Sequence, residues 1–261
     1  MSTFESRKRS REVNEKLIKF ALIGAAVISI LTTFGILFSI LFEAIEFFKL
    51  RSFWYFITGA TWSPGVIGSK FGALPIFAGT FVITIIALGV AIPVGLGSAI
   101  YMSEYASATL RDYLKPLLEI LAGIPTVVYG FFAAITVAPL VVQIAEFFGL
   151  EATFNSALAS GVVMGIMIIP VISSLSDDVI RAVPDSPRKA AFALGMTHGE
   201  TIKNIVLPSA MPGIISASLL GLSKALGETM IVVMAAGLRP NLSWNPLEDM
   251  TTVTVTIVNS L

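Results

Sequence analysis

The sequence contains no cysteine and only one histidine, His198, among its 261 residues. Without cysteine the chain has no disulfides, no thiolate metal sites and no cysteine nucleophile. A single histidine excludes a zinc helix of the H-E-x-x-H type and leaves little material for a Ser-His-Asp triad. The sequence therefore argues against hydrolytic chemistry.

Charge is scarce as well. Charged residues make up 13% of the chain, against roughly 25% in an ordinary soluble domain. The 17 basic and 17 acidic residues cancel, so the balance predicts no nucleic-acid partner and no surface for acidic substrates. Hydrophobic residues account for 55%, and the mean hydropathy is +0.87. This composition predicts an all-α integral membrane protein with several spans.

Long apolar runs are abundant. A crossing needs about 20 apolar residues, and five stretches meet this length: Leu17–Phe42, Phe71–Met102, Pro116–Ala145, Phe154–Leu175 and Pro208–Gly237. The first follows a basic leader, but it is longer than the apolar core of a signal peptide and lacks a clear cleavage site. We interpret it as a retained anchor. The glycines and prolines within the spans are expected to serve helix packing.

Basic residues predict the orientation. Residues 1–16 are rich in Lys and Arg, which places them in the cytoplasm and makes residues 17–261 the transmembrane domain. Alternation then puts the basic loop at 177–207 on the same side. The last apolar stretch, TTVTVTIVNSL, is too short to cross as a helix. Either the C-terminus lies outside after five spans, or a sixth helix follows Leu261.

The loop at 177–207 carries helix signals. Ser186 is expected to cap a first helix with Pro187 at its first position. Gly195 suits the left-handed residue that ends a helix. Thr197–Glu200 reads T-x-x-E, a capping box, and Pro208 is expected to bound the second helix. The pattern predicts two short amphipathic helices joined by a tight turn.

This loop has two interpretations. The apolar side chains of Ile202, Ile205 and Val206 share one face and need cover, which the chain's own bundle can provide. Alternatively, the helices dock a second protein in a helix-in-groove manner. The residues alone do not decide between the two. His198, in the same loop, is expected to be solvated.

The segment KALGET places Lys224 and Glu228 inside the last apolar run. Charges at membrane depth are costly and usually face a bundle interior or a water-filled path. Being four apart, the two residues share a helix face and can pair. They are therefore either a structural ion pair or part of a substrate pathway, and the second interpretation is favoured because intramembrane ionisable residues mark pathways.

The stretch KAAFALGMTHGETIKNIVLP resembles the EAA loop of ABC-importer permeases. That pattern reads E-A-A, three residues, Gly, nine residues, Ile, one residue and Leu-Pro. Lys189 stands where the family usually has Glu, which is a departure. The resemblance implies contact with an ATPase through the matching positions, which are Ala190, Ala191, Gly195, Ile205, Leu207 and Pro208.

A wider resemblance extends over most of the chain. FGALPIFAGTFVIT, PVGLGSAIYMSEYA, LLEILAGIPTVVYGFFA and LGLSKALGETMIVVMAAG are similar to permease subunits of phosphate-specific (Pst) importers, PstC type. This implies a type I ABC-importer (MetI-like) fold with six helices, the sixth missing here. It also implies a second related permease subunit, two ATPase subunits and an external phosphate-binding protein. No G-x-x-x-x-G-K-[ST] occurs in the chain, so a partner is expected to bind ATP and magnesium, and no cofactor is expected in this subunit.

The resemblance implies that Lys224 contacts phosphate, where the family commonly reads R-A-L-G-E-T, and that transport proceeds by alternating access. Three rivals remain. The substrate can be another oxyanion such as sulfate or molybdate. The chain can be an ion-coupled secondary transporter with Glu228 as proton site, although no inverted repeat is found. It can also be a membrane scaffold without a transport role.

Overall fold

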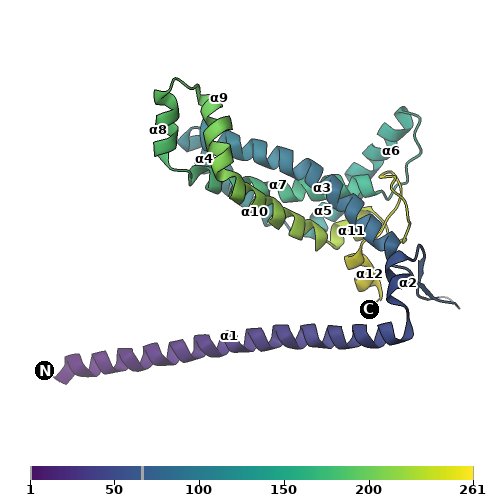
Figure 1. Cartoon of the computed structure of the whole chain (residues 1–261), viewed down its shortest axis with the longest axis horizontal. Coiled ribbons are helices and arrows are strands. Elements are labelled where there is room, and N and C mark those ends of the chain that lie inside the picture. The colour runs from purple at the N-terminus through teal and green to yellow at the C-terminus, as the bar shows by residue number, and fades with distance from the viewer. Residues whose placement is uncertain (1, 66–67, 261) are drawn as a thin grey trace. The chain divides into compact units, whose positions relative to one another are not determined.

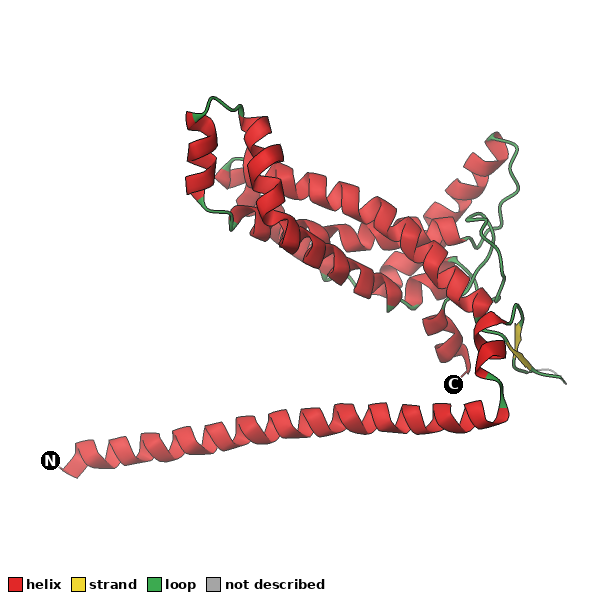
Figure 2. Cartoon of the chain, in the orientation of Figure 1, coloured by secondary structure: helices red, strands yellow, loops and turns green. Residues whose placement is uncertain are grey.

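The computed structural model describes residues 2–65 and 68–260, with side chains from residue 15 onward. Most of this part of the chain is helical (Figure 2). The elements are α1 (Ser2–Leu50), α2 (Phe53–Thr58), β1 (Trp62–Ser63), β2 (Lys70–Phe71), α3 (Leu74–Ile100), the π-helix η1 (Tyr101–Tyr105), α4 (Ala108–Ala122), α5 (Thr126–Phe132), the π-helix η2 (Ala133–Val137), α6 (Ala138–Phe147), α7 (Ala157–Arg181), α8 (Asp185–Ala193), α9 (His198–Thr201), the π-helix η3 (Ile202–Val206), α10 (Leu207–Leu226), α11 (Met230–Ala235) and α12 (Val253–Ser260).

The chain divides into two compact units, 1–56 and 57–261. The first unit is dominated by α1, a single helix whose stretch Glu15–Leu50 is long and apolar enough to cross a membrane. Its apolar residues cover all sides, which is the pattern of a membrane-spanning helix. The predicted first span is confirmed, and the helical backbone also continues through residues 2–16.

The second unit is built around α3 and α7. Glycine permits their close approach: a Cβ on Gly165 of α7 would lie 2.8 Å from the carbonyl oxygen of Ala87 in α3. The hydrophobic effect does not drive helices together within a membrane. Small residues allow the close van der Waals packing that does so instead. Branched and sulfur-containing side chains fill the remaining space, and the fully buried ones include Ile83, Met164, Met167, Ile168 and Ile172.

The segment 236–252 runs back over the start of α7. The amide of Ala157 donates to the carbonyl of Glu248 at 3.1 Å, and that of Leu158 donates to the carbonyl of Pro246 at 2.8 Å. Ser156 caps the same helix through its side chain, which accepts from the amide of Ala159. The first turn of α7 thus has partners for amides that a helix leaves unpaired. Nearby, β1 and β2 form an antiparallel pair with Trp62 opposite Phe71.

Within the residues that the structure describes, five helical stretches are long and apolar enough to span, as predicted. Their boundaries differ from the predicted ones, most of all in the third and fifth spans. The third span does not begin at Pro116, which lies inside the separate helix α4; it runs over Thr126–Phe147. The fifth span does not continue to Gly237, because α10 ends at Leu226 and α11 begins at Met230. Hydropathy averaged over a window does not register either interruption.

Pro208 does not end the second loop helix. The helix continues from α9 through η3 into α10, where Pro208 is near the N-terminus. In the π-helical turn the amide of Leu207 donates to the carbonyl of Ile202, five residues back. This one-residue expansion shifts the hydrogen-bond register just before the proline, whose nitrogen has no hydrogen to donate.

Candidate functional site

The first charged site lies where α10 gives way to α11. Lys224 is in the last turn of α10, and Gly227 is the C-cap residue of that helix. Residues 227–229 are not helical. Irregular backbone within a membrane protein's apolar segments occurs where it is buried in protein or lines a water-filled cavity. The break therefore belongs to the interior of the bundle or to a path through it.

Glu228 caps the second half of the broken helix. Its Oε1 accepts hydrogen bonds from the amides of Met230 at 3.0 Å and Ile231 at 3.3 Å. The residue is 7% exposed, and its carbonyl accepts from the hydroxyl of Thr254 at 2.9 Å. A carboxylate at this position satisfies unpaired amides and opposes the positive end of the helix dipole. Glu228 therefore stabilises the break.

The predicted pairing of Lys224 with Glu228 is wrong. The two residues do not share a helix, because the chain leaves helical geometry between them. Among the described residues, Lys224 takes part in no ion pair or hydrogen bond that bridges elements. Its side chain is half-buried. Within the described part of the chain, Lys224 beside the break thus has no carboxylate within ion-pair distance.

The second candidate site is the hairpin of α8 and α9, residues 185–201, which lies at the end of the second unit away from α11 and α12 (Figure 1). Its turn is a Schellman motif: the amide of Met196 donates to the carbonyl of Ala191, and that of Gly195 to that of Phe192. Gly195 has φ +81°, a left-handed conformation that glycine adopts at no steric cost. The predicted helix end is confirmed.

The start of the second helix is also confirmed, because Thr197 and Glu200 form a full capping box. The start of the first helix was predicted wrongly. It begins at Asp185 with Pro184 as the N-cap residue, so Ser186 is not the cap. Pro187 then occupies the third helical position. That position tolerates proline because the first four amides of a helix have no partner within it.

The two helices of the hairpin differ in how far the rest of the chain buries their apolar side chains. Ile202 and Val206 are buried against the bundle, so the chain itself covers the apolar face that follows α9. On α8 the buried residue is Ala191, whereas Phe192 is 47% and Leu194 85% exposed. The other positions of the EAA-like pattern are exposed (Ala190, Gly195 and Pro208) or half-buried (Ile205 and Leu207). The structure thus brings apolar residues of α8 to the surface.

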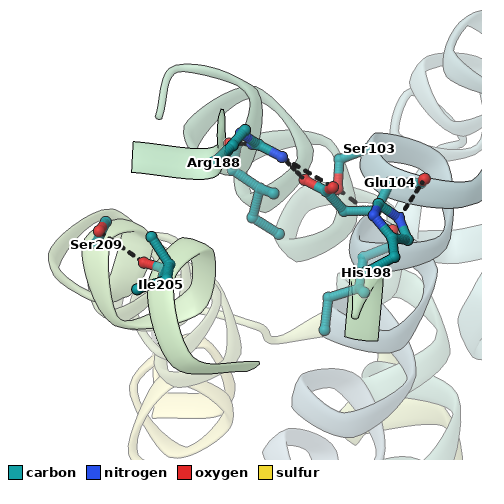
Figure 3. A network of polar contacts seen from close by, with 8 residues as sticks. Ser103, Glu104, Arg188, His198, Ile205 and Ser209 are labelled. Carbon is teal, nitrogen blue, oxygen red and sulfur yellow. Dashed lines mark hydrogen bonds and ion pairs between the residues drawn. The ribbon is translucent and has the colours of Figure 1, made fainter. Parts of the chain in front are cut away.

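A polar network ties this hairpin to η1, the turn that continues α3 (Figure 3). The Nη1 of Arg188 lies 2.7 Å from Oε1 and 2.8 Å from Oε2 of Glu104. The Nη2 of Arg188 donates to the carbonyl of Ile180 at 3.0 Å. His198 donates from Nε2 to the carbonyl of Glu104 at 3.2 Å, and its ring packs near Tyr105. Although His198 is exposed as expected, it is also fixed by these contacts.

Two further ion pairs hold α4 against α7. Arg111 donates from Nη2 to Oδ2 of Asp177 at 2.7 Å, and the Asp177 side chain is fully buried. Lys115, one turn further along α4, pairs with the next residue of α7, Asp178. Sequence reasoning missed these pairs and the one between Arg188 and Glu104. The partners are 63 to 84 residues apart, and no local pattern records such contacts.

No group of His, Cys, Asp and Glu residues suited to a metal ion occurs within residues 2–65 and 68–260. The two sites offer a charged group and an exposed apolar surface. The last turn of α10, next to the break, carries the half-buried cation Lys224. The hairpin presents apolar side chains on a helix that is fixed from behind by charged contacts.

Comparison with known proteins finds a match between residues 91–245 and the family described as "Binding-protein-dependent transport system inner membrane component". The matched region contains the hairpin and the break. The chain is 32% identical over 254 residues to the probable ABC transporter permease protein YqgH of Bacillus subtilis (strain 168), covering 97% of this chain and 81% of the relative. It is 34% identical over 266 residues to the phosphate transport system permease protein PstC 1 of Mycobacterium tuberculosis (strain ATCC 25618 / H37Rv), covering 90% and 78%. Among solved structures, inward-facing MetNI methionine ABC transporter matches with TM-score 0.46 and 22% identity over 64% of this chain and 74% of that chain.

Proposed function

The chain belongs to the family of binding-protein-dependent transport system inner membrane components, and on that premise we propose that it is the permease subunit of an ATP-driven importer of inorganic phosphate. Support for the substrate comes from relatives that are named phosphate transport system permeases, at 34% and 35% identity. The structural observation that carries the proposal is the unpaired ammonium of Lys224 at the helix break. Lysine is an established phosphate binder, acting as a point charge.

In this proposal Lys224 attracts phosphate to the pathway, and Glu228 shapes the pathway beside it. The carboxylate of Glu228 is engaged by two amides of α11, so it does not compete with phosphate for Lys224. The two side chains carry no net formal charge together, but the amides that hold Glu228 leave the ammonium of Lys224 as the group that can contact an anion. An anion passing through an apolar bundle needs such a group, because the bundle otherwise offers it little solvation.

The hairpin is the proposed contact with a partner ATPase, through the exposed side chains of α8 and the positions that match the EAA pattern, which are Ala190, Ala191, Gly195, Ile205, Leu207 and Pro208. ATP and magnesium would be bound by that partner, since the chain has no P-loop motif. The remaining partners are a second related permease subunit, a second ATPase subunit and an external phosphate-binding protein. The hairpin and the N-terminus would then both lie in the cytoplasm, in agreement with the basic residues 1–16.

Transport would proceed by alternating access. Nucleotide binding to the ATPases favours one arrangement of the helix bundle over the other. The shift cannot exceed the difference in the free energy of nucleotide binding between the two arrangements. Phosphate then leaves its external receptor for the pathway at Lys224. Hydrolysis of ATP restores the starting arrangement. In this scheme the chain performs no bond chemistry of its own.

The test is uptake of labelled phosphate into proteoliposomes that contain this chain with its partner permease, ATPase and binding protein. We expect uptake that requires ATP and that unlabelled phosphate competes away more strongly than sulfate or molybdate. Stronger competition by sulfate or molybdate would reassign the substrate within the same class. Uptake that continues without the ATPase would contradict the importer mechanism and favour a secondary transporter.

A matched pair of hairpin variants tests the ATPase contact. Gly195→Val forces a β-branched residue into a left-handed conformation, which costs roughly 1–2 kcal/mol and disturbs the turn before α9. We expect uptake and ATPase stimulation to fall together. Gly199→Ala, at an exposed helical position where a Cβ meets nothing within 4 Å, is the control and should leave both unchanged. Equal behaviour of the two variants would contradict the role of the hairpin.

A further inference from the structure

Helix α8 is held to the rest of the molecule at very few points. Within α8, Ala191 is the buried residue, and Arg188 is the residue whose side chain makes hydrogen bonds to other elements. The helix otherwise presents exposed side chains, among them Phe192. Arg188 is therefore the polar contact by which a displacement of α8 reaches the bundle, beside the packing of Ala191 and the short chain link at residues 182–184.

Arg188 contacts two long helices at once. Through Glu104 it reaches η1, which continues α3 without interruption. Through the carbonyl of Ile180 it reaches the last turn of α7. Because α3 and α7 form the packed centre of the unit, the guanidinium joins the exposed hairpin to the core directly. Figure 3 shows Arg188 and Glu104 facing each other, with His198 on the far side of Glu104.

The contact is difficult to break. The side chain of Glu104 is 3% exposed and that of Arg188 18%. A buried carboxylate that loses its partner keeps its desolvation penalty, so separation of the pair is strongly opposed. His198 adds a second tie from α9 to the same turn, through the carbonyl of Glu104. The hairpin and η1 are thereby fastened from two sides.

We propose that Arg188 is a positioning residue that transmits movement of α8 to α3 and α7, with Glu104 as its receiver. This inference rests on the proposed function, in which α8 is the helix that meets the ATPase. When the ATPase shifts α8, the ion pair carries η1 and α3 along, and through the carbonyl of Ile180 it carries the end of α7. Loss of the pair uncouples the hairpin from the bundle while the ATPase still binds.

One measurement needs no partner. The chain has no cysteine, so Ser186→Cys on α8 and Val94→Cys on α3 accept spin labels without background in the full chain in lipid nanodiscs. We expect a narrow distance distribution between the labels. It should broaden with Arg188→Gln and narrow again in the charge swap Arg188→Glu with Glu104→Arg. A distribution that Arg188→Gln leaves narrow would overturn the proposal.

A second measurement determines the ratio of phosphate imported to ATP hydrolysed in the reconstituted complex. We expect a fall of about tenfold with Arg188→Gln, within the usual range of coupling between sites, while ATPase activity persists. The charge swap should restore part of the ratio. Arg188→Lys should give a ratio between those of Arg188→Gln and wild type, because one ammonium does not reproduce the guanidinium's contacts with both Glu104 and Ile180. A ratio unchanged by Arg188→Gln would overturn the proposal.

The control is Arg181→Gln, which removes an exposed cation from the same end of the bundle. It should change neither the label distances nor the ratio. If wild-type complexes import no phosphate, the proposed substrate fails, and the label distances still decide the role of Arg188. If import is intact and Arg188→Gln changes neither readout, the role of Arg188 fails and the substrate stands.

Discussion

Arg188 and Lys224 are both cations in the second unit of an apolar membrane chain, and the structure treats them in opposite ways. Arg188 is bound to a nearly buried carboxylate and a backbone carbonyl. Lys224 is half-buried and forms no ion pair within the described residues. A charge that is paired with a buried carboxylate of the same chain holds structure. A charge left without a partner in an apolar setting is available to an external anion. Because the charge is partly desolvated there, pairing with such an anion stabilises it.

The largest effect on stability is expected from breaking the paired site. Glu104→Gln leaves the guanidinium of Arg188 without its counter-charge in a mostly buried position. We expect a loss of about 3 kcal/mol in the free energy of unfolding, toward the lower end of the range for buried pairs because Arg188 is partly exposed. Thermal unfolding of the purified chain in detergent measures it. The control is Glu15→Gln, at an exposed position of the first unit, and equal stability of the two variants would contradict the assignment.

A smaller effect is expected at the cap of α11. Glu228→Ala removes the acceptor for the amides of Met230 and Ile231. Loss of a helix cap typically costs about 1 kcal/mol. Glu228→Asp and Glu228→Gln keep an acceptor and should recover part of this loss. If Glu228→Ala is as stable as wild type, the carboxylate does not stabilise the break, and its role in a pathway with Lys224 would have to be direct.

A still smaller effect concerns Glu248, in the segment that covers α7. Hydrogen bonds from Ser243, Asn241 and Asn245 hold the pKa of its carboxyl below the ordinary value of 4.5. Because the pKa is lower in the folded chain, this contribution is present above pH 4.5 and is lost as the pH falls through the folded value. We expect the protection of the amides of residues 241–248 against hydrogen exchange, taken relative to the intrinsic exchange rate at each pH, to fall below that pH. In Glu248→Gln this protection should no longer depend on pH, and a dependence that persists would assign it to another group.

Local signals in the sequence predicted local structure well. The left-handed Gly195 and the capping box of Thr197 and Glu200 were both predicted and are both present, because these motifs are closed by residues within a few positions of each other. The membrane spans were predicted for a similar reason, since length and apolarity are properties of each segment. The N-cap at Ser186 was wrong because an alternative start, after Pro184, lies only two residues away.

Features that depend on distant contacts could not be predicted. Glu104 and Arg188 are 84 residues apart, and neither stands out in its own segment. The break at residues 227–229 was hidden because GET lies in an apolar run, where the pairing of Lys224 with Glu228 looked natural. The stabilising element for the break, Thr254, comes from a segment 26 residues away. The ATPase contact and the role of Lys224 remain predictions.

The most direct test of the account compares phosphate uptake by wild type, Lys224→Gln and Lys224→Arg in the reconstituted complex, with unfolding measured on the same preparations. Because Lys224 has no partner to lose, we expect Lys224→Gln to change the free energy of unfolding by no more than about 0.5 kcal/mol and to reduce uptake by about tenfold or more, the effect of 1.4 kcal/mol on a transition state. Lys224→Arg keeps the charge and should retain most of the uptake. Unchanged uptake in Lys224→Gln, or an uptake loss explained by unfolding, would contradict the claim that the unpaired cation at the helix break serves the substrate.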